Sequence, residues 1–187
     1  MKKSIRLLKE MEKVVYDKKF ARENPDLELY RVQRGVKRKG ELRYDITILF
    51  SKMLGEEYAR TKGNHNSNNF PELYTLLEGE ALVLLQKAQG ERIKEIYALK
   101  MKPGNWINIK PEESIILINP TDKIVKTANW VSDQNENIYQ DLERMGGMGY
   151  YYTKSGWIKN ENYKFVPELE FKKPLEKKPE NLDYLKG

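Results

Sequence analysis

Few residues in this chain can do acid–base, nucleophilic or metal-binding chemistry. The 187 residues include one histidine, His65, and no cysteine. Without cysteine, the chain can form no disulfide, thiolate zinc site, iron–sulfur ligation or cysteine nucleophile. A single histidine excludes every site that needs two imidazoles, including the HExxH metalloproteases and zinc fingers. These exclusions limit the kind of site that the chain can build.

Glu72 is a candidate for acid–base chemistry. Strand alternation places Glu72 and Tyr74 on one face, with Leu73 and Thr75 on the other. A carboxylate that points into a small barrel is costly unless it is paired or used. A surface glutamate in a turn after Pro71 is the alternative interpretation.

Other polar segments give weaker signals. His65 lies between two asparagines and before Ser-Asn-Asn at residues 67–69, a composition that favours a solvated loop. The run GGMG at residues 146–149 is not a phosphate-binding loop, because no Lys-Ser/Thr follows it. The three tyrosines at residues 150–152 are interpreted as structural.

In the segments that must position these residues, apolar side chains recur with a period of two, as in β-strands. Residues 43–50 read RYDITILF, where aromatic or aliphatic side chains alternate with Arg, Asp, Thr and Leu, and this predicts a strand. Six more apolar runs, separated by turn signals, are at residues 73–77, 81–86, 93–99, 106–109, 115–118 and 124–131. This spacing predicts an all-β fold, a small antiparallel barrel or sandwich.

We divide the chain into an N-terminal arm (1–26), a barrel domain (27–164) and a C-terminal extension (165–187). Apolar spacing predicts a helix within residues 5–20, with a short β run at its end as the alternative. Residues 137–144 are expected to form a short helix before two glycines. The extension is rich in Pro, Lys and Glu, and either wraps in extended form over the barrel or is a partly disordered tail.

Charge and hydropathy limit the partners and the location. The 34 Lys and Arg against 28 Asp and Glu give a net charge of +6. This permits attraction to phosphate-bearing ligands, although a solvated surface explains it as well. No apolar run approaches the ~20 residues that cross a bilayer, and the N-terminus lacks the apolar stretch of a signal peptide. We therefore expect a soluble, cytoplasmic protein with no membrane partner.

Residues 61–66 read TKGNHN and are followed by Glu72-Leu73-Tyr74 and Gly79. This pattern resembles the first cupin motif and, more narrowly, the archaeal-type cupin phosphoglucose isomerases (glucose-6-phosphate isomerases). Similar segments are residues 2–12, which read KKSIRLLKEME, and residues 102–119, which correspond to the second cupin motif. With Thr47 and Tyr139, the resemblance covers roughly residues 2–145.

The resemblance implies a cupin-type jelly-roll barrel and an aldose–ketose isomerase. Such an enzyme interconverts glucose 6-phosphate and fructose 6-phosphate through an enediol. Glu72 would be the proton-transfer base. The residues that would contact the sugar phosphate are Thr47, Thr61, Gly63, Tyr74 and Tyr139.

The metal ligands of that family are mostly replaced here. The family holds one divalent metal with two histidines and a glutamate of the first motif and a histidine of the second, where this chain has Ile115. At most His65 and Glu72 remain as ordinary ligands. Asparagine oxygens and water would have to complete the shell. We therefore expect a weakly bound divalent metal or none.

Two alignments of residues 64–66 are open, because the interval to Glu72 is one residue shorter than in the family. A deletion directly after Gly63 would put Asn64 and Asn66 in place of both histidines. A deletion before the pair would make His65 the second histidine, with its spacing to Glu72 retained. We prefer the second alignment for its ligand spacing.

Two other functions compete with an isomerase. A catalytically inactive cupin could bind a sugar phosphate or other small anion without a tightly bound metal, which would suit Ile115. Weaker still is nucleic-acid binding through Lys37-Arg38-Lys39 and the tyrosines at 150–152. A homodimer is expected from fold analogy alone.

Overall fold

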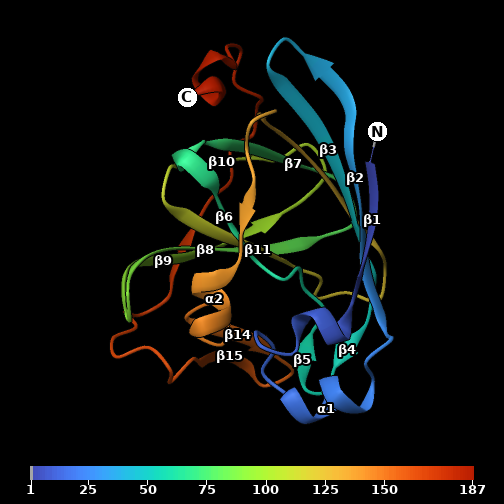
Figure 1. Ribbon diagram of the computed structural model, residues 1–187, viewed down its shortest axis with the longest axis vertical. Coiled ribbons are helices and arrows are strands. Elements are labelled where there is room, and N and C mark those ends of the chain that lie inside the picture. The colour runs from blue at the N-terminus through green and yellow to red at the C-terminus, as the bar shows by residue number, and fades with distance from the viewer. Residues whose placement is uncertain (1) are drawn as a thin grey trace.

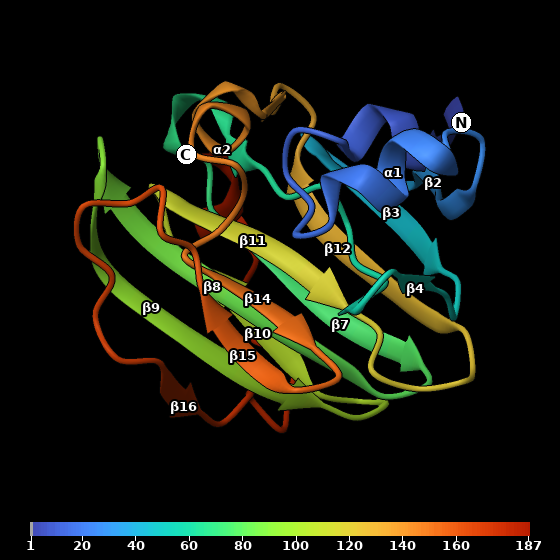
Figure 2. The ribbon, with the colours of Figure 1, turned by 90° about the horizontal axis from the view of Figure 1, so that it is seen from below.

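Two sheets, antiparallel except for one short edge strand, lie face to face (Figures 1 and 2). The computed structural model describes residues 2–187. The larger sheet has the order β1 (Lys2–Leu7), β2 (Glu28–Lys39), β3 (Leu42–Leu49), β12 (Val125–Ser132), β7 (Glu72–Glu78) and β10 (Trp106–Ile109). The smaller sheet has the order β11 (Glu113–Ile118), β8 (Ala81–Gln89), β9 (Arg92–Met101) and β16 (Glu170–Lys172).

Short elements complete the fold. One small sheet joins β4 (Met53–Leu54), β5 (Glu57–Tyr58), β14 (Tyr150–Thr153) and β15 (Gly156–Lys159), and another pairs β6 (His65–Asn66) with β13 (Asn137–Ile138). The α-helices are α1 (Lys18–Glu23) and α2 (Gln140–Arg144). The 3-10 helices are η1 (Leu8–Met11), η2 (Ser67–Asn69) and η3 (Asp183–Lys186).

The strand order is that of a jelly roll, which confirms the expected fold class. β3, β12, β7 and β10 are neighbours in one sheet. The segment before β7 runs beside β11 in the other sheet, because Thr61 N donates to Leu117 O at 2.9 Å and Asn64 pairs with Ile115. The chain therefore alternates between the two sheets, as in the double Greek-key arrangement of jelly rolls.

All seven predicted strands of the barrel are present. β11 is buried along its whole length. Ile115 and Leu117 line the space between the sheets, while Ile116 and Leu142 of α2 both lie against Gly63. A strand covered on both faces reads as a continuous apolar run rather than an alternation. The predicted helix near residues 137–144 is present as α2.

The prediction of a helix over residues 5–20 was wrong. Lys2–Leu7 forms β1, which pairs with β2 at the edge of the larger sheet. Leu8 and Met11, each 0% exposed, lie in η1, and α1 begins only at Lys18, where Asp17 Oδ1 accepts from Phe20 N at 2.9 Å. The apolar spacing correctly identified the buried side chains. The backbone conformation, however, is set by the pairing of β1 with β2 and by the turns that follow.

The C-terminal segment wraps in extended form around the molecule. β16 pairs in parallel with β9, and Leu175 and Trp106 exchange backbone hydrogen bonds of 2.8 Å. Leu182 and Leu185 then pack with Leu42 and Leu73 in a second apolar cluster. Within residues 2–187, no helix has the length and apolar character needed to span a membrane.

Candidate functional site

A polar cavity lies between the two sheets. Its empty volume, including the part open to solvent, is about 590 Å³. The residues that line it are Arg6, Tyr30, Val32, Arg34, Arg43, Asp45, Thr47, Thr61, Gly63, Asn64, Glu72, Tyr74, Ile115, Leu117, Asn129, Asn137 and Tyr139.

The polar face of β3 points into this cavity. Arg43, Asp45 and Thr47 are at most 9% exposed, and alternation places all three on one side of the strand. Tyr44, Ile46 and Ile48 alternate with them and lie on the outer face, where the rings of Tyr44 and Trp130 are 4.8 Å apart. The inner face of the larger sheet is therefore polar where it lines this cavity.

Glu72 begins β7 and points inward, as strand parity predicted. It is 4% exposed, and both carboxylate oxygens accept hydrogen bonds, Oε2 from Asn66 Nδ2 at 3.2 Å and Oε1 from Asn129 Nδ2. Burial raises the pKa of Glu72 to about 7, although the Asn66 hydrogen bond and the charge of Arg43 oppose this rise. A carboxyl with this pKa can both take and return a proton near neutral pH.

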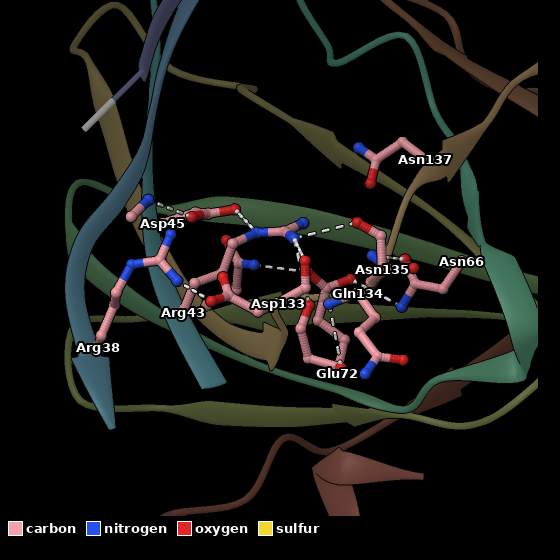
Figure 3. A network of polar contacts seen from close by, with 12 residues as sticks. Arg38, Arg43, Asp45, Asn66, Glu72, Asp133, Gln134, Asn135 and Asn137 are labelled. Atoms are coloured by element: carbon pink, nitrogen blue, oxygen red, sulfur yellow. Dashed lines mark hydrogen bonds and ion pairs between the residues drawn. The ribbon is translucent and has the colours of Figure 1, made fainter. Parts of the chain in front are cut away.

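A buried network holds the surroundings of Glu72 (Figure 3). Asn66 Oδ1 accepts from Asn135 Nδ2 at 3.0 Å. Arg43 donates to the carbonyl oxygens of residues 132, 133 and 135 at 3.0–3.2 Å and to Asp45 Oδ2 at 3.0 Å. The loop after β12 is thereby fixed against the strand that carries Arg43.

The residues expected to hold a sugar phosphate line the same cavity as Glu72. They are Thr47, Thr61, Gly63, Tyr74 and Tyr139. Gly63 has a φ of +87°, and an added Cβ would be 2.7 Å from Ile116 Cγ2, so this close approach requires glycine. The Tyr139 ring lies 5.7 Å from the guanidinium of Arg6 and 5.1 Å from the ammonium of Lys62.

Three arginines of the cavity, Arg6, Arg34 and Arg43, were not among the predicted site residues. A signal for Arg43 was present in the sequence, because it alternates in step with Asp45 and Thr47. Arg6 lies in the N-terminal segment that carries part of the family resemblance. Arg34 had no signal of its own, since β2 shows no clear alternation there.

His65 is not brought together with Glu72. It lies on β6 and lines a separate cavity with Gln86, Ser114 and Tyr163, while Asn64 lines the Glu72 cavity and Asn66 bonds to Glu72. This placement agrees with the alignment that keeps Thr61-Lys62-Gly63 in register, rather than the one that we preferred. The reason is strand parity, since neighbouring residues point to opposite sides.

The side chains around Glu72 do not fit a tightly held transition metal. Within residues 2–187, no group of three or more His, Cys, Asp or Glu side chains could hold a metal ion. The amides of Asn66 and Asn129 direct nitrogen rather than oxygen at Glu72, and Ile115 offers no donor. Such a set suits a hydrogen-bonded carboxyl better than a metal shell.

The tyrosines at 150–152 do not form a stacking surface. Tyr150 and Tyr151 are 5% and 6% exposed, and Tyr152 packs against Trp157 with ring centroids 4.7 Å apart. The tyrosines at 150–152 are therefore not available to stack on nucleic-acid bases, as the nucleic-acid-binding hypothesis required.

Comparison with known proteins links the chain to sugar-phosphate enzymes. The family model described as "Glucose-6-phosphate isomerase (GPI)" matches residues 10–168. The chain is 31% identical over 129 residues to the glucose-6-phosphate isomerase of Thermococcus litoralis, covering 65% of each chain. It is 30% identical over 129 residues to that of Pyrococcus abyssi, covering 65% of this chain and 66% of the relative.

These alignments thus span slightly less than two thirds of the first relative's length. Among solved structures, the Cnp3 cupin domain of Schizosaccharomyces pombe matches with 12% identity and a TM-score of 0.41. That match covers 65% of this chain and 72% of the other.

Proposed function

The chain belongs to the glucose-6-phosphate isomerase family, and we propose that it interconverts glucose 6-phosphate and fructose 6-phosphate. The observation that carries this proposal is the buried Glu72, with its pKa raised to about 7, in one cavity with hydroxyl, backbone and arginine groups suited to an anion. Aldose–ketose isomerisation needs both features, a proton carrier and a hold on the phosphorylated sugar.

In this proposal Glu72 moves one proton between adjacent carbons of the open-chain sugar. As carboxylate it takes the proton from C2 of the aldose, and as carboxylic acid it returns it to C1 of the enediol. The hydrogen bonds from Asn66 and Asn129 fix both oxygens of the carboxylate, so that the group is oriented before the substrate arrives.

The phosphate would lie against the side of the cavity that carries Thr47, Thr61 and Gly63. The backbone at Gly63 can approach an anion closely, and Arg6 and Tyr139 add a charge and a hydroxyl from the same cavity. Tyr74, two residues after Glu72 on β7, would contact the sugar. No step is assigned to a metal. A hard cation held weakly by Glu72, an asparagine oxygen and water is the most that this donor set supports, and His65 would not take part.

An isomerase assay of the purified protein tests the proposal. We expect turnover that is retained in chelator and changes little with added divalent metal. Glu72→Gln should lower kcat by about 10²–10⁴-fold while binding of glucose 6-phosphate, measured by calorimetry, is retained. His65→Gln is the matched control and should leave turnover unchanged. Unchanged turnover in Glu72→Gln would remove Glu72 from the mechanism.

A second candidate is a sugar-phosphate-binding protein without turnover. It is favoured by Ile115, which is 3% exposed and fills one side of the cavity with an aliphatic group. Binding of glucose 6-phosphate by the wild-type protein, with no product formed at any pH from 6 to 9, would select this function.

A further inference from the structure

Three guanidinium groups line the cavity of Glu72, and two of them already have partners in the protein. Arg6 donates to the Tyr30 hydroxyl at 3.2 Å and forms an ion pair with Glu10 at 2.7 Å. Arg43 forms an ion pair with Asp45 and donates to three backbone carbonyls. Both guanidinium groups are therefore positioned by these partners.

Arg34 is different. It is half-buried and lines both the Glu72 cavity and the adjoining mouth, which it shares with Asn137 and Tyr139. Across residues 2–187, the structure shows no hydrogen bond or ion pair from the Arg34 guanidinium. The nearby carboxylate of Asp45 binds other donors, since Oδ1 accepts from Gly35 N at 2.8 Å and Oδ2 from Arg43 Nε at 3.0 Å.

The backbone beside Arg34 is fixed by a bulge. The pairing of β2 with β3 shifts register between Gln33 and Lys37. Gly35 has a φ of +67°, and its N–H is bound by the buried Asp45. A bulge changes the direction of the side chains next to it. The backbone that directs Arg34 toward the cavity is therefore fixed by the bulge and by the hydrogen bond to Asp45.

The positive charge of Arg34 acts on Glu72 and Tyr74 in the cavity. Burial raises the pKa of Glu72 and of Tyr74, and the positive charge of Arg34 lowers both. A half-buried guanidinium without a protein partner can donate hydrogen bonds to an anion that enters the cavity. Since Glu72 supplies the base, the group still missing from the proposed reaction is one that stabilises negative charge on the substrate oxygen.

We propose that Arg34 is a further catalytic residue, whose guanidinium stabilises the enediolate oxygen while Glu72 carries the proton. This inference rests on the proposed isomerase function. Glu72 removes the proton at C2, the C–H electron pair forms the C1–C2 double bond, and the carbonyl pair moves to O1, which becomes negative. Arg34 holds this oxygen until the O2 proton passes to O1 and Glu72 returns its proton to C1, giving the ketose.

The test compares Arg34→Gln and Arg34→Lys with the wild type. Loss of one preorganised donor to an oxyanion lowers kcat by about 10²–10³-fold, so we expect this loss in Arg34→Gln with KM changed less than about threefold. Arg34→Lys should recover part of kcat, because it keeps the charge without the planar fork. Inorganic phosphate should inhibit wild type and variants equally. Arg38→Gln, at the same mouth, is the control and should leave all values unchanged.

Other outcomes overturn the inference. An unchanged kcat in Arg34→Gln contradicts it, and a raised KM with weaker inhibition by inorganic phosphate would assign Arg34 to the phosphate group instead. Absence of turnover in the wild type would refute the isomerase proposal itself. Binding then decides the role of Arg34. The carboxylate of 5-phosphoarabinonate imitates the enediolate, so Arg34→Gln should weaken this ligand at least tenfold relative to inorganic phosphate, and equal weakening of both would end the proposal. Unfolding curves check that the variants fold.

Discussion

At the scale of single residues, the site is governed by how Glu72 is solvated. Removal from water disfavours its charged form, and two asparagine amides with nearby arginine charges compensate only in part. A fully paired carboxylate would remain ionised and would be a poor acid. Incomplete compensation is what brings the pKa close to neutral, and it would let one group perform both proton transfers of the proposed reaction.

The first prediction at this scale concerns stability against pH. The pKa of Glu72 is about 7 when folded and near its ordinary value of 4.5 when unfolded, so only the unfolded chain gains by ionising between these values. The free energy of unfolding of wild type relative to Glu72→Gln should therefore fall as pH rises from about 4.5 to 7, by up to about 3 kcal/mol, and level off above. Chemical denaturation at several pH values measures it, and a pH-independent difference would contradict the raised pKa.

The second prediction concerns Asn66. Its amide hydrogen bond favours the charged form of Glu72, so Asn66→Ala should raise the pKa of Glu72 above that of the wild type. Carbon-13 NMR of the labelled glutamate carboxyl groups measures this without an activity assay. His65→Gln is the neighbouring control, since His65 lines the other cavity. Equal titration in both variants would remove Asn66 from the control of Glu72.

At the scale of elements, one arginine joins a strand to the loop that supports the site. Arg43 on β3 binds three carbonyls of residues 132–135 and the carboxylate of Asp45. From the same loop Asn135 reaches Asn66, which in turn reaches Glu72. The position of Glu72 therefore depends on a contact made two strands away in the same sheet.

Arg43→Met should destabilise the protein by about 3–5 kcal/mol, because it leaves the Asp45 charge and several carbonyls buried without a partner. Arg38→Met removes an ion pair with Asp133 in which the arginine is 61% exposed, and should cost less than about 1 kcal/mol. Urea denaturation of both variants tests the contrast. Similar losses in the two would mean that burial does not set the strength of these pairs.

Strands were predictable because their signal is local. Alternation along residues 43–50 and the apolar runs of β7 to β12 predicted an all-β barrel or sandwich, and the resemblance to the cupin motifs narrowed this to a jelly roll. Strand parity correctly predicted that Glu72 points inward. The side to which His65 points depends on the register of the short β6 against β11 and β13, which no local pattern contains. The helix expected over residues 5–20 failed for a similar reason, since β1 is held by hydrogen bonds to distant residues of β2.

At the scale of the whole molecule, the C-terminal segment covers the outer face of the larger sheet. Leu182 and Leu185 are 4% and 0% exposed. They pack with Leu73, the residue that follows Glu72, and with Trp106 and Trp130. The last turn of the chain is therefore part of the core that supports β7.

Leu185→Ala should lower the free energy of unfolding by about 2–5 kcal/mol, because it opens a cavity in this cluster. Leu175→Ala is the matched control, since Leu175 is 45% exposed, and should change stability by less than about 0.5 kcal/mol. Denaturation followed by tryptophan fluorescence measures both. A Leu185→Ala protein as stable as the wild type would show that the segment does not support the sheet.

The inward turn of the polar side of β3 separates where this protein gains stability from where it meets its ligand. Part of the apolar packing lies outside the two layers, at α2, the β14–β15 hairpin and the C-terminal residues. Cavity residues without partners in the fold, unlike Arg43, can thus be exchanged at modest cost to folding. A scaffold of this kind is suited to evolutionary change, because new ligands or reactions can be acquired by replacing inner residues while the outer layers keep the architecture intact.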